Sequence, residues 1–430
     1  MTGRTALFMP LLLVAVAVGL VAQTPAPTAF AIQNARIVTV SGPTIDNGTV
    51  VIQDGKIADV GAGVAVPQGA RIIDGRGLTV YPGLFDADTT MAMRAAESTL
   101  GQFTPELRAS TSFEVENLRI PVTRVLGVTH VMVRNARGII PGYGDVLSLA
   151  GWTPDEMALK RRAALVLLFP SVGDLGYTDD ERFAVTAYSV TKAQVDRRVR
   201  EIKEFFAASR AYLKTKEEAG SGAALAINER YEAMIPVLKR QAPVIIEATN
   251  SEDIKAAVRF GKEENLDFII GAHGGAAPVA DFLKENNVRV LLTSMKIMPE
   301  TEDDPVDIVY RTPAILHEKG VPFGIATLAN RLANPKLLPF DAGNAVAHGL
   351  PYQAALRAVT LTPAEFLGIP DLVGSIDKGK VANLVVVNGD ILDYGSDVKH
   401  LFINGRPVSL DTKDTELYQK YLNRPKPIRK

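Results

Sequence analysis

The sequence predicts a mixed α/β protein in which an eightfold (β/α)8 barrel of the TIM type is joined to a small β domain. Strand and helix patterns alternate through residues 81–373, which is typical of parallel α/β folds and a length that suits an eightfold barrel. Strand-rich segments lie on both sides of it, at residues 30–80 and 374–410. Because the first of these is too small to bury much core alone, we expect the two to form one unit.

Composition narrows the possible chemistry. The chain has 430 residues, with 47 Lys and Arg against 48 Asp and Glu, five His and no Cys. The net charge of −1 shows no excess of basic residues of the kind that binds nucleic acid. The lack of Cys excludes disulfides, thiolate zinc sites and cysteine nucleophiles. Five histidines also set an upper limit on any histidine-rich metal centre.

Residues 1–23 have the pattern of a secretory signal peptide. Arg4 precedes an apolar run over residues 6–22, after which the chain turns polar and rich in proline. The alternative is a membrane anchor that is never cut. That run is shorter than the ~20 apolar residues a spanning helix needs, and it contains Pro10. We therefore expect a periplasmic or secreted protein with no stable membrane anchor after cleavage.

Turn signals place the strands of the small β domain. Val- and Ile-rich runs between residues 30 and 80 flank Asp54-Gly55 and Asp74-Gly75, and Asp-Gly pairs are typical of hairpin turns. Similar runs at residues 381–392 and 400–408 include the turn pair Asn404-Gly405. The chain ends should therefore supply the strands of one domain. The polar, proline-containing segment 411–430 is predicted to be a loose tail.

The central segment alternates short apolar strands with amphipathic helices, one of which opens with a capping pattern at Ser251. A charged helical insertion occupies residues 191–240, broken by small residues at 220–224. Its charge run predicts a solvated face, with a partner surface as the alternative. The predicted strands are 128–133, 164–169, 243–249, 267–272, 288–294 and 321–327.

Two longer motifs resemble the amidohydrolase superfamily, and in particular its imidazolonepropionase-like branch. One is IIDGRGLTVYPGLFDAD, which ends at Asp88, and the other is ALRAVTLTPAEFLGIPDLVGSIDKGKVANLVVV, which ends at Val387. The resemblance covers nearly all of the chain after the signal peptide. It implies a barrel with a small β-sandwich built from both termini, and hydrolysis of a non-peptide carbon–nitrogen bond.

The resemblance also implies a metal site, whose ligands can be compared position by position. The family has a His-x-His pair on strand one, His on strands five and six, and Asp on strand eight. This chain has Asp88 and Thr90 in place of the pair, Glu247 on strand five and His273 on strand six. Strand eight offers Thr327 and Leu328, whereas strand four cannot be aligned. The usual binuclear centre is therefore not encoded.

Two interpretations of the altered site stay open. Asp88, Glu247 and His273 would together hold one divalent metal, zinc or manganese, because two carboxylates and an imidazole suit such ions. Asp86 or Asp88 would then act as the catalytic proton shuttle. In the other interpretation the pocket is a relict, whose carboxylates are solvated or paired, without a tightly bound metal.

These interpretations predict two functions. The protein is an exported hydrolase acting on a small molecule, or it is a non-catalytic paralogue that binds a ligand or supports an active relative as a subunit. The expected partners are accordingly a small-molecule ligand or substrate and, in an oligomer, a second copy or such a relative. Arg108, Arg124 and Arg134 are candidates to bind a ligand carboxylate, with scattered surface arginines as the alternative. His130, in an apolar strand, is predicted to be a core residue.

Overall fold

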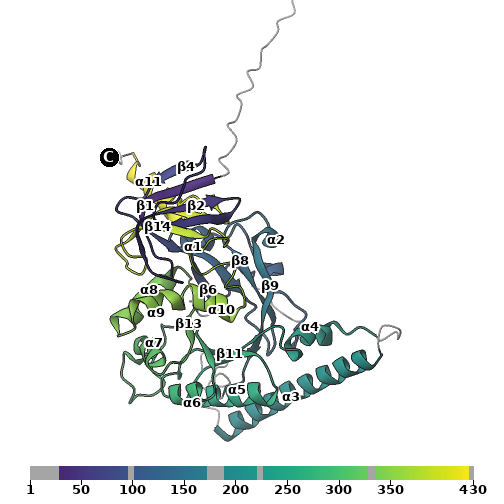
Figure 1. Ribbon diagram of the computed structural model, residues 1–430. Coiled ribbons are helices and arrows are strands. Elements are labelled where there is room, and N and C mark those ends of the chain that lie inside the picture. The colour runs from purple at the N-terminus through teal and green to yellow at the C-terminus, as the bar shows by residue number, and fades with distance from the viewer. Residues whose placement is uncertain (1–28, 95–100, 172–187, 220–225, 328–334, 426–430) are drawn as a thin grey trace, which may run out of the picture.

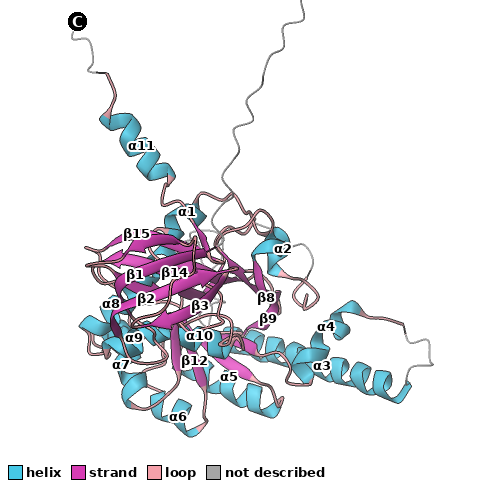
Figure 2. Ribbon diagram, turned by 45° about the horizontal axis from the view of Figure 1, so that its top comes forward, coloured by secondary structure: helices cyan, strands magenta, loops and turns pink. Residues whose placement is uncertain are grey.

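The computed structural model describes residues 29–94, 101–171, 188–219, 226–327 and 335–425. The predicted signal peptide, Leu328 and the break at 220–224 lie outside these residues. The described chain forms two eight-stranded sheets, and most of its helices pack around one of them (Figures 1 and 2). The predicted mixed α/β class is therefore confirmed.

The first sheet, the terminal sheet, combines strands from both ends of the chain. Its order is β16-β15-β14-β5-β1-β2-β3, with β4 paired to β1. The central pairing joins the two ends, because Leu384 lies opposite Pro82 and Val387 opposite Thr79. The strands are β1 (Ala29–Ile37), β2 (Ile45–Gln53), β3 (Lys56–Gly61), β4 (Arg71–Asp74), β5 (Thr79–Pro82), β14 (Leu384–Asn388), β15 (Asp397–Ile403) and β16 (Arg406–Pro407).

The second sheet, the barrel sheet, runs in sequence order from β6 to β13 and curls into a nearly closed barrel. Its strands are β6 (Leu84–Thr89), β7 (Val128–Val133), β8 (Gly142–Ser148), β9 (Ala158–Leu168), β10 (Val244–Ala248), β11 (Phe268–Ala272), β12 (Arg289–Leu292) and β13 (Phe323–Ile325). The end strands are linked by the Thr327 amide, which donates to Asp86 Oδ1 at 2.9 Å.

One strand departs from the predicted parallel arrangement. β8 pairs antiparallel with both β7 and β9, whereas the other neighbouring strands of the barrel sheet pair in parallel. A loop over residues 134–141 connects β7 to β8 without a helix. A short connection can only join antiparallel strands, because a parallel return needs a crossover of a dozen or more residues. The strand–helix repeat is therefore interrupted at this point.

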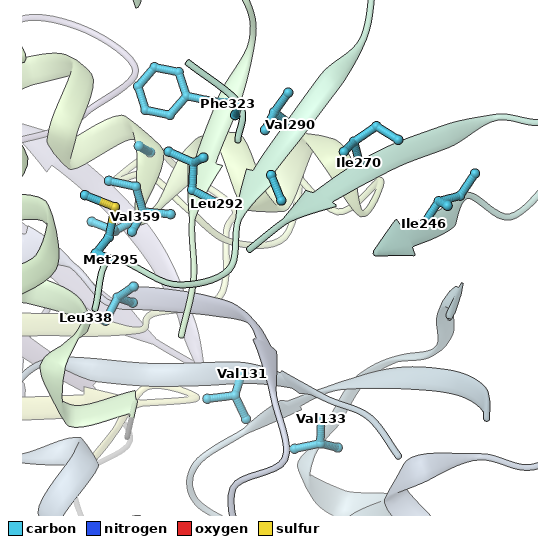
Figure 3. Packing of buried hydrophobic residues seen from close by; sticks show 14 of the residues in the cluster. Val131, Val133, Ile246, Ile270, Val290, Leu292, Met295, Phe323, Leu338 and Val359 are labelled. Atoms are coloured by element: carbon cyan, nitrogen blue, oxygen red, sulfur yellow. The ribbon is translucent and has the colours of Figure 1, made fainter. Parts of the chain in front are cut away.

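The two faces of the barrel sheet are packed differently. Side chains alternate along a strand, so Ile246, Ile270 and Val290 share one face and pack in the large core between the sheet and its covering helices (Figure 3). Ile245 and Ile269 belong to a smaller cluster with Phe85 and Met132. This smaller cluster fills the interior of the barrel. The side chains nearer the carboxyl ends of the strands pack on top of it.

The helices follow the strands for the most part, and α3 extends well away from the barrel sheet (Figure 1). Asn228 caps α4, with its side chain accepting from the amides of Arg230 and Tyr231. The helices are α1 (Arg119–Arg124), α2 (Pro154–Met157), α3 (Tyr188–Ala219), α4 (Glu229–Leu238), α5 (Ser251–Glu263), α6 (Ala280–Glu285), α7 (Ile308–Glu318), α8 (Leu338–Ala347), α9 (Tyr352–Ala358), α10 (Leu361–Phe366) and α11 (Lys413–Leu422).

The C-terminal segment, predicted to be a loose tail, contains a helix that its sequence pattern does not predict. α11 lies within it and begins at a reciprocal cap, in which Thr412 and Thr415 each accept from the other's backbone amide. None of its side chains is buried. The cap therefore specifies this helix where a buried apolar face does not. None of the described helices has both the length and the apolar content that crossing a membrane requires.

Candidate functional site

The candidate site lies where the strands of the barrel sheet end. Asp86 and Asp88 belong to the last four residues of β6, Glu247 lies near the end of β10, and His273 follows β11 directly. Because these strands run in the same direction, their carboxyl ends meet at one edge of the sheet. The structure brings Asp88, Glu247 and His273 together in one network of ion pairs and hydrogen bonds. Asp86 instead contacts Thr327, which follows β13.

Arg134 holds this network together. It follows β7, and its Nε donates to Asp88 Oδ1 at 2.6 Å while its Nη2 forms an ion pair with Glu247 Oε1. Its Nη1 donates to the Asn135 carbonyl at 3.1 Å. The side chains of Arg134, Asp88 and Glu247 are 4%, 0% and 5% exposed. The arrangement is a buried ion-pair network in which one guanidinium contacts two carboxylates.

Burial and charge act in opposite directions on these carboxylates. Burial raises the pKa of Asp88, and the nearby charge of Glu247 raises it further against the opposing pull of Arg134. Burial would also raise the pKa of Glu247, but the charges of Arg134 and His273 outweigh it and hold that pKa below its usual range. Glu247 is therefore the carboxylate that stays ionised and balances the guanidinium.

His273 completes the network on its exposed side. Its Nε2 lies 3.0 Å from Glu247 Oε2, and its side chain is 25% exposed. Burial disfavours the imidazolium, but the hydrogen bond and charge of Glu247 outweigh burial, so the pKa of His273 is raised. Gly271 gives Glu247 its room, because a Cβ at this position would lie 3.1 Å from Glu247 Cγ. His273 is thus a proton donor or acceptor oriented by a carboxylate.

Asp86 has a different environment. Its carboxyl group is fully buried and accepts from the Thr327 amide at 2.9 Å and from Thr327 Oγ1 at 2.5 Å. Burial raises the pKa of Asp86 to about 8, with the hydrogen bonds from Thr327 acting against it. In this position Asp86 joins the first and last strands of the barrel sheet. Its predicted catalytic role stays a prediction.

A cavity of about 490 Å³ opens beside His273. It lies at the carboxyl ends of β10, β11 and β12, and His273 is the member of the network that lines it. Apolar side chains form much of its wall, with Asn250 and Ser294 among the polar groups. The apolar side chains include Met295, Ile297, Met298, Ile308 and Val309.

The donor set of the network does not fit a divalent metal as it stands. A cation between Asp88 and Glu247 would lie against the Arg134 guanidinium, which already contacts both carboxylates. Asp88 Oδ2 has no hydrogen-bond partner among the described residues, but one carboxylate oxygen is not a metal site. In the described part of the chain, no group of three or more His, Asp or Glu side chains is placed to hold a metal ion.

Two of the three arginines that the sequence offers as carboxylate-binding candidates have partners within the protein. Arg134 is buried, and the carboxylates that it contacts belong to the protein itself. Arg124 donates to the Leu149 carbonyl at 3.1 Å instead. The sequence could indicate that Arg134 suits carboxylates, but it could not show that β7 places it between β6 and β10.

His130 is buried in the barrel interior, as predicted. Its Nδ1 lies 2.7 Å from Thr129 Oγ1, its ring centroid lies 4.5 Å from that of Phe85, and burial lowers its pKa to about 3. An unfolded His titrates near 6.5, so below that pH the unfolded chain binds a proton that the folded chain does not. This difference should remove about 2 kcal/mol of stability between pH 7 and pH 5.

Urea unfolding at the two pH values tests this contribution. In His130→Asn, the loss of stability on acidification should be smaller than in the wild type by that amount. His317→Asn, a change on the exposed surface of α7, should behave like the wild type. An equal pH dependence in all three proteins would contradict the assignment.

The fold and site together define an α/β-barrel protein with ionisable side chains at the carboxyl edge of its sheet. The family model described as "Amidohydrolase family" matches residues 187–408, about half of the chain, and the chain belongs to that family. Members of this superfamily usually bind divalent metals at the barrel mouth. The ion pairs of Arg134 with Asp88 and Glu247 therefore differ from the usual metal site of this superfamily.

Individual relatives are distant. The chain is 24% identical over 398 residues to an adenine deaminase of Desulforamulus reducens, which is 91% of this chain and 59% of that protein. It is 36% identical over 76 residues to the amidohydrolase tasK of Hapsidospora irregularis, which is 18% of this chain and 8% of that protein. The chain thus spans less than two thirds of the length of either relative.

Solved structures agree on the fold. An amidohydrolase from Thermotoga maritima MSB8 superposes with a TM-score of 0.75 at 23% identity, covering 88% of this chain and 99% of that one. Molinate hydrolase superposes with a TM-score of 0.57 at 17% identity, covering 94% and 99%. At these identities the likeness concerns the fold and not the reaction.

Proposed function

We propose that this amidohydrolase-family protein binds a small, largely apolar organic molecule in the cavity beside His273. The cavity carries the proposal, since its volume of about 490 Å³ lies within the range of ligand sites. Its place at the carboxyl ends of the strands is where barrel proteins bind their ligands. Apolar walls with a few polar groups are typical of such sites.

The wall indicates the kind of molecule. Met295, Ile297 and Ile308 offer apolar contacts, while His273 and Ser294 offer hydrogen bonds. Glu300, at the rim, is already engaged, because it accepts from the Ser251 hydroxyl at 2.6 Å and from the Ser251 amide at 3.1 Å. A ligand with an apolar body and one polar end directed at His273 therefore suits the cavity.

A second candidate is hydrolysis of a non-peptide carbon–nitrogen bond, in a cyclic amide or an N-substituted amino acid derivative. The pair of His273 and Glu247 favours it, because an imidazole oriented by a carboxylate on a cavity wall is able to take a proton from water. His273 would return that proton to the leaving nitrogen. We rank this second, because the donor set around Arg134 does not suit the metal that members of this superfamily usually bind.

Several further expectations belong to the same proposal. We propose that the barrel sheet is a TIM-type (β/α)8 barrel with one reversed strand, and that the terminal sheet belongs to a small β-sandwich. We also propose export to the periplasm or medium after removal of residues 1–23, and membership of the imidazolonepropionase-like branch. Assembly with itself or with an active relative is the form in which a ligand-binding paralogue would act.

Ligand-observed NMR with purified protein tests the binding. We expect a compound from a panel of cyclic amides and N-acyl amino acids to bind the wild type. Binding should weaken by about tenfold or more in Ser294→Phe, which fills the cavity, and in His273→Ala, which removes a polar contact worth ~1.4 kcal/mol. The matched control His317→Ala, on the exposed surface of α7, should bind normally.

Two results would contradict the proposal: no binding by any compound of the panel, or binding that Ser294→Phe leaves unchanged. Mass spectrometry of the same mixtures tests the second candidate. Hydrolysis adds one water to a cyclic amide and releases the free amino acid from an N-acyl amino acid. Either product, formed by the wild type but not by His273→Gln, supports hydrolysis. Binding without turnover supports ligand binding and contradicts hydrolysis.

A further inference from the structure

The position of Arg134 is the feature that the proposed function leaves unexplained. Three of its side-chain groups have assigned partners, since Nε contacts Asp88, Nη2 contacts Glu247 and Nη1 contacts the Asn135 carbonyl. Its backbone amide donates to the Thr89 carbonyl at 3.0 Å, which fixes the start of the side chain beside β6. Arg134 is therefore held at both ends, in a place where its side chain is 4% exposed.

The charges around it indicate what the guanidinium does. Asp88 on β6 and Glu247 on β10 are both buried acidic side chains. Two carboxylates in one buried site repel each other and need a cation or a proton. A guanidinium supplies that charge permanently, and its planar donors reach carboxylates on two sides.

We propose that Arg134 is the resident cation of this site, taking the place of a divalent metal. Its guanidinium lies between Asp88 and Glu247, where an ion bound by both would have to lie. A metal would thus have to displace a permanently charged side chain that cannot lose its proton. Removing the guanidinium leaves Asp88, Glu247 and His273 free to converge on a cation, so one substitution should convert the ion-pair network into a metal site.

Equilibrium dialysis against zinc or manganese, with the bound metal measured by mass spectrometry, tests this inference on tag-free protein. Wild-type protein should retain less than about one tenth of an equivalent, and Arg134→Met about one equivalent. Arg134→Gln, which is smaller and neutral but keeps hydrogen-bonding groups, should also gain metal. Adding Glu247→Gln to either variant should abolish the gain, because it removes a carboxylate ligand.

The controls separate a specific site from general loosening. Arg124→Met removes a half-buried arginine that donates to the Leu149 carbonyl, and it should bind no more metal than the wild type. If Arg134→Met is unstable alone, zinc should raise its melting temperature and should not raise that of Arg134→Met/Glu247→Gln. If neither Arg134 variant folds with or without metal, the inference is wrong, since the three ligands then do not form a site.

Two further results would overturn it. One is stoichiometric metal in the wild type that Glu247→Gln removes, and the other is a folded Arg134→Met that binds no more metal than the wild type. Neither result depends on the organic ligand of the cavity. Failure of this inference is therefore distinguishable from failure of the proposed function.

Discussion

Replacing Glu247 with alanine is expected to lower the free energy of unfolding by about 3–5 kcal/mol, because it leaves a buried charge without its partner. Glu247 is the group that Arg134 and His273 share, and it is 5% exposed. Its loss leaves the guanidinium with Asp88 alone, whose own pKa is raised by burial. Urea unfolding at pH 7 measures the change.

A surface ion pair provides the matched control. Lys203 and Glu263 lie 2.7 Å apart with side chains 45% and 57% exposed. Removing Glu263 in Glu263→Ala should therefore cost less than about 1 kcal/mol. Equal and small losses in both variants would mean that the network around Arg134 does not stabilise the fold.

Replacing Asp86 with alanine should destabilise the protein by about 3 kcal/mol or more, because several buried donors lose their acceptor. The amide and hydroxyl of Thr327 both donate to this carboxyl group, and the Asp88 amide lies 3.3 Å from it. The loss acts at the junction between β6 and β13, so it should also loosen the closure of the barrel sheet. Hydrogen exchange of the Thr327 amide, together with urea unfolding, measures both effects.

Asp86→Asn distinguishes the hydrogen bonds from the charge. Because burial raises the pKa of Asp86 to about 8, the carboxyl group is mostly neutral at pH 7 and an amide is a close substitute. We expect this variant to lose less than about 1.5 kcal/mol. A loss as large as that of Asp86→Ala would show that the ionised carboxylate is what the structure needs.

Much of the fold could be predicted from local patterns. The apolar runs that form β10 and β11 are short and continuous, and helix signals lie on both sides of them. Such runs are typical of buried strands in a parallel sheet. β8 could not be predicted because Gly142 and Gly144 weaken the strand pattern of its sequence. Its residues are buried because the neighbouring strands cover them, which its own sequence does not indicate. α11 could not be predicted because a reciprocal cap specifies it without an apolar face.

The site could be predicted as a set of side chains but not as an arrangement. Asp88, Glu247 and His273 come together because parallel strands bring their carboxyl ends to one edge, which the sequence pattern implies. The place of Arg134 depends on the register of β7 against β6, which contains irregularities next to Leu84 and after Asp86. A single sequence carries no signal of such a shift, so the guanidinium could be assigned a preference for carboxylates but not its partners.

The pairing of β5 with β14 has a consequence for biosynthesis. About 300 residues separate these strands in the chain, and closing so long a loop is slow because of its entropy. The ribosome must therefore synthesise the chain through β14 before β5 gains this neighbour. A nascent or truncated chain that stops before Leu384 would leave the free edge of β5 open to strands of other molecules.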